Sequence, residues 1–173
     1  MRTTTVQIVM VSHVNGANRL FGGQLMEWID VTAAVEARRH AYSDVTTAAI
    51  DALEFLAPVF LNDTLVLQAE VTWTGKTSIE VRVETYREHL NGERVLVNRA
   101  YFLFVAVDEN GKPRPVKPFI PHGPVQQREW ENAIKRREHR LKVREEMNAL
   151  AAFKNEQALI RRNQVNDHDP EHA

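Results

Sequence analysis

Residues 15–30 read NGANRLFGGQLMEWID and place a polar loop, a Gly-Gly pair and the start of a helix in succession. After the glycines, apolar residues recur at the three- and four-residue spacing of one buried helix face; they are Leu25, Met26, Ile29, Ala33 and Ala37. Asp30 falls inside this run. Because an acid on an apolar helix face loses hydration, it needs a polar partner or a chemical function.

The Gly22-Gly23 pair lies where the predicted helix begins. At a helix start, unpaired backbone N–H groups and the positive end of the helix dipole can meet an oxygen that carries negative charge. Glycine also lets a ligand come close to that backbone. One segment therefore offers both a carboxylate and an oxyanion-binding helix end.

Composition limits the classes of function that need to be considered. The chain has 173 residues, enough for one domain with an extension, and 43% of them are apolar. A net charge of −1 gives no argument for binding nucleic acid or an anionic membrane, although residues 125–163 hold 10 Lys/Arg against 6 Asp/Glu. No cysteine is present, so there is no disulfide framework and no thiolate zinc site. With neither a signal-peptide pattern nor an apolar run of ~18 residues, we expect a cytoplasmic protein outside the membrane.

The remaining pattern predicts one helix followed by a run of strands. We expect a strand at 4–11, a loop at 12–21, the helix at 22–41, and extended segments at 45–55, 64–74, 78–86 and 94–107. In residues 78–86, hydrophobic and charged residues alternate strictly, which is typical of a sheet with one face in water. This order indicates an α+β domain in which an antiparallel sheet packs one face on the helix.

We expect this domain to span residues 1–124. Residues 125–163 are rich in Arg, Lys, Glu and Ala, with apolar residues at roughly helical spacing. They predict a charged helical extension, formed by one long helix or two shorter ones. Residues 164–173 are expected to be a disordered tail.

Five segments in order resemble the signature of the hexameric hotdog acyl-CoA thioesterases. They are Asn15, the string FGGQLMEWID at 21–30, VTTA at 45–48, TGKTS at 74–78 and FLFVAVD at 102–108. The resemblance covers about residues 5–120. It implies a hotdog fold, in which a sheet of about five strands wraps a central helix. It also implies hydrolysis of acyl-CoA to free fatty acid and CoA without a cofactor or metal, by a homo-oligomer with a dimer as its minimal unit and a hexamer, a trimer of dimers, as its full assembly.

The resemblance also implies which residues form the site. In that family an acid on the helix, an asparagine fifteen residues before it and a Ser/Thr seventeen residues after it line the active site; these fall on Asp30, Asn15 and Thr47. The helix start would bind the thioester oxygen, with Gly22, Gly23 and Gln24. The turn between two strands would approach the CoA, with Gly75, Lys76, Thr77 and Ser78. Asn18 and Arg19 occupy loop positions that would tune acyl preference.

Other interpretations of these residues remain open. Thioester hydrolysis needs either a water deprotonated by a base or a carboxylate that attacks directly, and the sequence does not choose between these roles for Asp30. Asp30 could instead be structural, bonded to a buried hydroxyl or an arginine. His13 and His40 suggest a hotdog dehydratase, although neither has a convincing acid partner. A non-catalytic module that senses acyl-CoA and regulates a partner is the main alternative, with residues 125–163 as its interaction arm.

Helix geometry adds an inference about assembly. Asp30 lies seven residues beyond Gly23, or ~10 Å along a helix, and Asn15 lies on the far side of the glycines. Within one chain, the helix start and Asp30 are too far apart to act on one small carbonyl group. An antiparallel helix from a second copy would bring the partner subunit's Asp30 beside this chain's Asn15. The sequence therefore predicts a composite site at a dimer interface.

Overall fold

The computed structural model describes the backbone of residues 2–166 and the side chains of residues 2–156. The chain divides into two compact units, Met1–Ile134 and Lys135–Ala173. Its elements are β1 (Thr3–Ile8), a short 3-10 helix η1 (Val11–His13), α1 (Gly22–Ala41), β2 (Asp44–Phe55), β3 (Thr64–Thr74), β4 (Ser78–Glu88), β5 (Arg94–Val107) and α2 (Gly123–Asn166).

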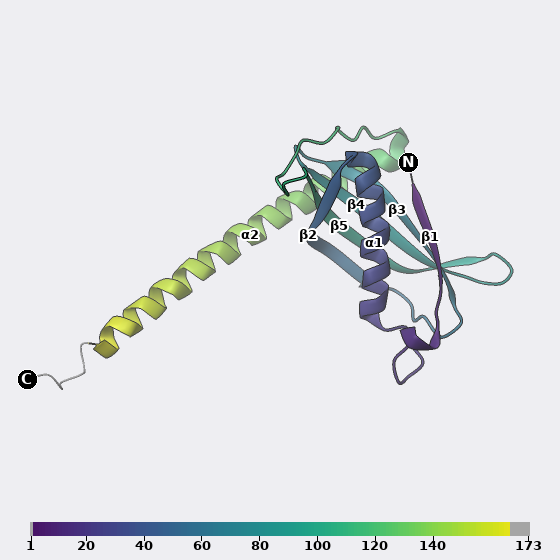
Figure 1. The fold of residues 1–173 in the computed structure, drawn as a ribbon, viewed down its shortest axis with the longest axis horizontal. Coiled ribbons are helices and arrows are strands. Elements are labelled where there is room, and N and C mark those ends of the chain that lie inside the picture. Colours follow the sequence, from purple (N-terminus) through teal and green to yellow (C-terminus); the bar gives the residue numbers. More distant parts are fainter. Residues whose placement is uncertain (1, 167–173) are drawn as a thin grey trace, which may run out of the picture. The chain divides into compact units, whose positions relative to one another are not determined.

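The five strands form one antiparallel sheet in the order β1-β3-β4-β5-β2. Helix α1 lies along one face of this sheet, with β1 and β2 at the two edges (Figure 1). The predicted α+β class, with an antiparallel sheet around a long helix, is thereby confirmed. Because β2 is an edge strand, the backbone groups on its outer side have no partner strand among residues 2–166.

The core lies between α1 and the sheet. Leu25, Ile29, Ala33 and Ala37 lie at four-residue spacing and are at most 2% exposed. The expectation that Met26 belongs to this buried face was wrong, because Met26 is 37% exposed. Its position is offset by one residue, or about 100° of helix rotation, from the buried row. Met26 therefore points out of the core, away from the face that packs on the sheet.

The first strand is shorter than predicted. It ends at Ile8, and residues 9–11 do not continue it. The N–H of Val9 donates to the carbonyl of Asp63 at 2.9 Å, and the N–H of Met10 donates to Nδ1 of His13 at 3.1 Å. These bonds replace strand pairing, so β1 ends three residues earlier than expected and the chain enters η1 at Val11.

Helix α2 is one continuous helix, and its beginning belongs to the first compact unit. Ala133 is fully buried, Nη1 of Arg82 lies 3.0 Å from Oε2 of Glu129, and Nε2 of Gln126 donates to Oε1 of Glu70 at 2.8 Å. These contacts hold the first turns of α2 to the sheet, and the first compact unit ends at Ile134. The expected tail overlaps α2 at residues 164–166, and residues 167–173 lie outside the described residues.

A carboxylate on the face of the sheet that carries α2 is held by two arginines. Glu84, whose side chain is 10% exposed, accepts hydrogen bonds from Arg99 at 2.8 Å and from the hydroxyl of Tyr86 at 2.9 Å, and Arg82 lies 3.9 Å away. Burial alone would raise the pKa of Glu84. The charge of Arg82 and the hydrogen bonds from Arg99 and Tyr86 outweigh it and hold the pKa below its ordinary value.

Replacing Glu84 by glutamine is expected to lower the free energy of unfolding by about 2 kcal/mol at neutral pH, because the arginines lose their counter-charge. A carboxyl group with a lowered folded pKa stabilises above its ordinary pKa of 4.5, and this stabilisation is lost as the pH falls below it. Urea unfolding of both proteins at neutral pH and at about pH 3.5 measures the difference. A difference that stayed constant across this range would contradict the assigned role.

Candidate active site

Asp30 and Thr47 are in contact. Asp30 projects from the middle of α1 and is half-buried, and Thr47 lies on the edge strand β2. The hydroxyl of Thr47 donates to Oδ1 of Asp30 at 2.9 Å. Within the described part of the chain, the second oxygen of Asp30 accepts no hydrogen bond. The structure therefore orients this carboxylate through one oxygen and leaves the other available.

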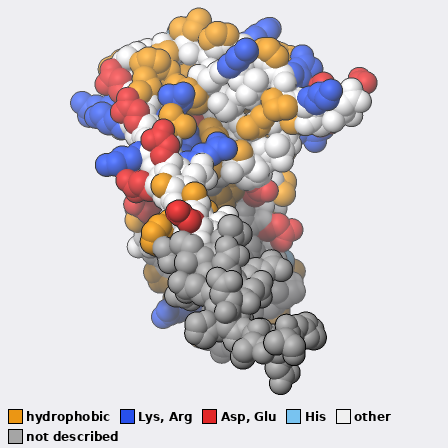
Figure 2. All heavy atoms as spheres, turned by 90° about the vertical axis from the view of Figure 1, so that its left-hand side faces the viewer, with side chains coloured by type: hydrophobic (Ala, Val, Ile, Leu, Met, Phe, Trp, Pro, Cys, Tyr) orange, Lys and Arg blue, Asp and Glu red, His pale blue; other side chains and the backbone are white. Residues whose placement is uncertain are grey.

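A cavity of about 360 Å³ opens beside this pair. Its lining combines residues of α1, β2 and β5; they are Gly23, Met26, Glu27, Asp30, Thr47, Ile50 and Phe102. Gly23 and Asp30 thus border one cavity, although they lie seven residues apart on α1. Figure 2 views the molecule from the left-hand side of Figure 1, and hydrophobic side chains are visible there among charged ones.

Glu27 is a second acid in this cavity that the sequence analysis did not identify. It lies three residues before Asp30, a spacing that places both on neighbouring turns of one helix face and that could have been recognised. Nε2 of Gln24 donates to Oε2 of Glu27 at 2.9 Å. The amide predicted to meet the thioester oxygen is therefore engaged with a carboxylate.

The start of α1 leaves its first backbone N–H groups without acceptors. Phe21 is the N-cap residue, and no side chain caps the helix. The N–H groups of Gln24 and Leu25 donate to the carbonyl of Phe21, at 3.0 and 3.2 Å. Among the described residues, those of Gly22 and Gly23 have no acceptor. A Cβ on Gly23 would lie 2.6 Å from the ring of Phe21, so glycine permits this close packing.

Asn15 lies in the loop before α1, outside the cavity of Asp30. Its Oδ1 accepts hydrogen bonds from the N–H groups of Ala17 at 3.0 Å and Arg19 at 3.2 Å. Asn18, at the tip of this loop, has a positive φ of 56°. The side-chain amide nitrogen of Asn15 has no partner among the described residues. One chain therefore does not bring Asn15 to Asp30.

Gly75, Lys76, Thr77 and Ser78 form the turn between β3 and β4. The N–H of Gly75 donates to the carbonyl of Ser78 at 2.8 Å, and a Cβ on Gly75 would lie 2.7 Å from Oγ of Ser78 and from the ring of Trp73. The carbonyl of Thr77 accepts from the N–H of Ala106 at 2.9 Å. Close packing therefore requires glycine at position 75. None of the four turn residues borders the cavity of Asp30.

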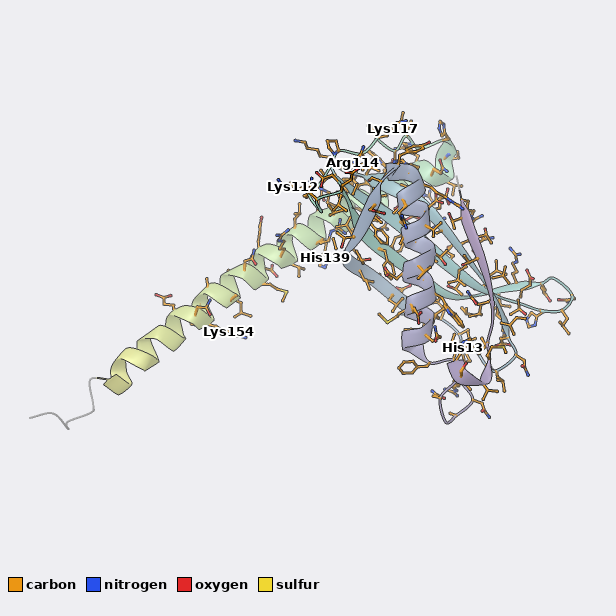
Figure 3. All side chains as sticks on the ribbon, in the orientation of Figure 1. His13, Lys112, Arg114, Lys117, His139 and Lys154 are labelled. Carbon is orange, nitrogen blue, oxygen red and sulfur yellow. The ribbon has the colours of Figure 1, made fainter. Side chains whose placement is uncertain are left out.

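A basic segment that the sequence analysis missed lies beside this turn. Residues 112–117 read KPRPVK, and the N–H of Val116 donates to the carbonyl of Lys76 at 3.0 Å. Lys112, Arg114 and Lys117 lie at the same end of the domain (Figure 3). With Lys76 they form the basic cluster of this end, and among the described residues none of the four has a carboxylate within 4.0 Å. The alternation of Lys112 and Arg114 with prolines was the sequence pattern that could have indicated this basic segment.

His13 and His40 have structural contacts. The ring of His13 packs edge-on against Trp28, with centroids 4.9 Å apart, and its Nδ1 accepts from the N–H of Met10. Nε2 of His40 lies 2.9 Å from the carbonyl oxygen of Lys117 and ties the end of α1 to the basic segment. Neither histidine borders the cavity of Asp30, so the arrangement does not favour a dehydratase.

The described residues contain no group of three or more His, Cys, Asp or Glu side chains that is placed to hold a metal ion. No helix among those residues combines the length and the apolar character that crossing a membrane requires.

Comparisons with known proteins identify the family. Residues 17–92 match the family model described as the thioesterase superfamily. An uncharacterized acyl-CoA thioester hydrolase of Bacillus subtilis is 39% identical over 138 residues, which cover 79% of this chain and 80% of the relative. The chain belongs to the thioesterase superfamily. Within that superfamily its curated relatives include several acyl-CoA thioester hydrolases, in agreement with the resemblance found in the sequence.

Solved structures give the same result. A hexameric acyl-CoA thioesterase in its apo form is 39% identical, with a TM-score of 0.78 over 82% of this chain and 91% of that one. An acyl-CoA hydrolase from Staphylococcus aureus, in complex with butyryl-CoA, CoA and CoA disulfide, is 32% identical. Its TM-score is 0.83, over 89% of this chain and 94% of that one. Three variants of that hydrolase, in which an aspartate, a threonine or an asparagine is replaced by alanine, have also been solved.

Proposed function

We propose that this protein hydrolyses acyl-CoA to free fatty acid and CoA, with Asp30 as the general base or the nucleophile. The observation that carries this proposal is the carboxylate of Asp30 at the edge of a cavity, oriented through one oxygen by the hydroxyl of Thr47. As a base, Asp30 takes a proton from the attacking water. As a nucleophile, it attacks the thioester carbonyl and expels CoA as its thiolate as the C–S bond breaks, which leaves an anhydride with the acyl group that water then hydrolyses.

The helix start supplies the second requirement of the reaction. Attack on the thioester carbonyl moves negative charge onto its oxygen, and donors aimed at that charge contribute ~3–4 kcal/mol each in well-ordered sites. The N–H groups of Gly22 and Gly23 are unpaired within the described residues and lie at the positive end of α1. They are the donors in this proposal.

The complete site forms between two copies of the chain. Asn15 lies outside the cavity of Asp30, and its free amide nitrogen can hold the water or the thioester oxygen. In the described part of the chain, the edge strand β2 has no neighbouring strand on its outer side, and Ile50 and Phe55 on it are 42% and 56% exposed. A second copy paired on this edge by a two-fold axis would lay the two α1 helices antiparallel and cover these side chains. The partner subunit's Asp30 would then approach this chain's Asn15.

The solved relatives support both the residues and the assembly. In the Staphylococcus aureus variants, the replaced asparagine precedes the replaced aspartate by 15 residues, and the replaced threonine follows it by 17. Asn15, Asp30 and Thr47 have the same spacing. The solved relatives also include hexamers. A homo-oligomer, with a dimer as the unit that completes the site, agrees with both observations.

CoA would lie along the turn at residues 75–78 and the basic segment at 112–117. The phosphates of CoA carry several negative charges, and Lys76, Lys112, Arg114 and Lys117 are cations without carboxylate partners in the described part of the chain. Charge-assisted hydrogen bonds to phosphate oxygens would hold the nucleotide end of the substrate away from the reacting carbonyl. These residues would contribute to binding rather than to the chemical step.

The joint replacement of Lys112 and Arg114 by glutamine is expected to raise KM for acyl-CoA about 10-fold, with kcat little changed, because phosphate contacts are lost equally in the ground and transition states. The effect should weaken as salt is added. Acyl-pantetheine, which lacks the phosphates, is the matched control and should show no change. An equal rise in KM for both substrates would contradict phosphate binding at this segment.

The function itself is tested by measuring the release of free CoA from acyl-CoA esters of graded chain length. The proposal expects catalytic turnover of at least part of this series. Tight binding of acyl-CoA without any release of CoA would contradict it and would favour the non-catalytic sensing module.

A further inference from the structure

A second cavity lies at the start of α1. It measures about 350 Å³ and is lined by Arg19, Leu20, Leu25 and residues 55–59, which read FLAPV. Every lining side chain except that of Arg19 is apolar. Pockets for small molecules commonly combine apolar walls with a few placed polar groups.

This cavity adjoins the proposed oxyanion-binding backbone. A Cβ on Gly22 would lie 3.6 Å from Cζ of Phe55, so the ring of Phe55 packs against the first residue of the helix. The N–H of Leu20 donates to the carbonyl of Val59 at 2.9 Å and fastens the loop to the opposite wall. The first turn of α1 therefore borders both cavities, the Asp30 cavity through Gly23 and this apolar cavity through Leu25.

Hydrogen bonds hold the backbone of Arg19, while its guanidinium is available to bind a ligand. Its N–H donates to Oδ1 of Asn15 at 3.2 Å, its carbonyl accepts from the N–H of Asn15 at 2.8 Å, and it forms an isolated bridge with Phe60. Among the described residues, no carboxylate lies within 4.0 Å of its guanidinium. The one charged group of an apolar cavity is thus without a counter-charge.

We propose that this cavity takes the acyl chain of the thioester, and that Arg19 favours acyl groups whose far end carries a carboxylate. The inference rests on the proposed thioesterase function and specifies its substrate class. With the thioester oxygen bound to the N–H groups of Gly22 and Gly23, the acyl chain can pass Phe55. Its methylene groups then lie along the apolar walls of this cavity. A terminal carboxylate would then meet the guanidinium of Arg19, which suits carboxylates by its forked donors.

The test compares hexanoyl-CoA with adipoyl-CoA, which have the same number of carbons and differ in the terminal carboxylate. The quantity measured is kcat/KM for each ester and the adipoyl-to-hexanoyl ratio. Arg19→Gln should lower this ratio about 10-fold or more, because a charge-assisted contact is lost for one ester only. Arg19→Lys should retain most of the ratio. Arg128→Gln, which removes an exposed arginine at the start of α2, should leave it unchanged.

Leu56→Trp tests the cavity itself by reducing its volume. It should lower kcat/KM for hexanoyl-CoA about 10-fold relative to acetyl-CoA, because the short ester does not reach into the cavity. An unchanged hexanoyl-to-acetyl ratio would overturn the placement of the acyl chain.

The outcomes for Arg19 separate this inference from the proposed function. An equal loss for both esters in Arg19→Gln would place the guanidinium on the CoA part and overturn the inference. No change for either ester would show a solvated side chain and overturn it as well. In both cases the wild-type protein still hydrolyses acyl-CoA. If the wild type released CoA from no ester, the proposed function would fail first.

Discussion

Replacing Asp30 by asparagine is expected to lower the turnover of acyl-CoA by roughly 100-fold or more. The asparagine oxygen can still accept the hydrogen bond from Thr47, so the shape of the cavity is kept. What is lost is the group that deprotonates water or attacks the carbonyl. Release of CoA measures kcat, and calorimetric titration with CoA shows that binding is retained.

Glu27→Gln is the matched control for this variant. It makes the same chemical change on the same helix face, in the same cavity. Its expected loss is under about 10-fold, because Glu27 is already engaged with Gln24. A folded Asp30→Asn protein with near-normal turnover would remove Asp30 from the chemistry. If Glu27→Gln alone abolished turnover, the catalytic role would pass to Glu27.

The elements that the sequence predicts well have strong local signals. The bounds of α1 at 22–41, β3 at 64–74 and β5 at 94–107 match the structure, since apolar periodicity and turn residues delimit each one. The predicted end of β1 was wrong because the chain there is held by a hydrogen bond from Val9 to Asp63. These residues are far apart in the sequence, so no local pattern indicates the bond. The docking of α2 likewise depends on Arg82 and Glu129, which lie 47 residues apart.

In the candidate site, too, local patterns could be recognised in the sequence, whereas contacts between distant segments could not. Asp30 and Thr47 were paired through a family pattern, and their hydrogen bond at 2.9 Å places them together. Helical spacing alone could have revealed Glu27. The association of Lys76 with residues 112–117 could not be deduced, because it depends on how β5 returns beside the turn at 75–78. The cavity at Arg19 similarly requires the meeting of the loop before α1 with the segment after β2.

The central claim is that one site takes Asn15 from one copy and Asp30 from another. Asn15→Ala and Asp30→Asn should each be nearly inactive alone. When the two are mixed and reassembled, random pairing gives about half heterodimers by the statistics of isologous interfaces. Each heterodimer holds one site with both lesions and one with an intact Asn15 and an intact Asp30. A hexamer built from such dimers gives the same expectation if its sites act independently.

Subunit exchange has to be demonstrated by mass or by differential tags, because a failure to mix would imitate a negative result. The measurement is the specific activity of the mixed, reassembled variants against that of the wild type. The account predicts recovery to about a quarter of the wild-type value, since about a quarter of the sites are intact. Zero recovery with proven exchange would contradict the composite site and would require Asn15 and Asp30 to act within one chain.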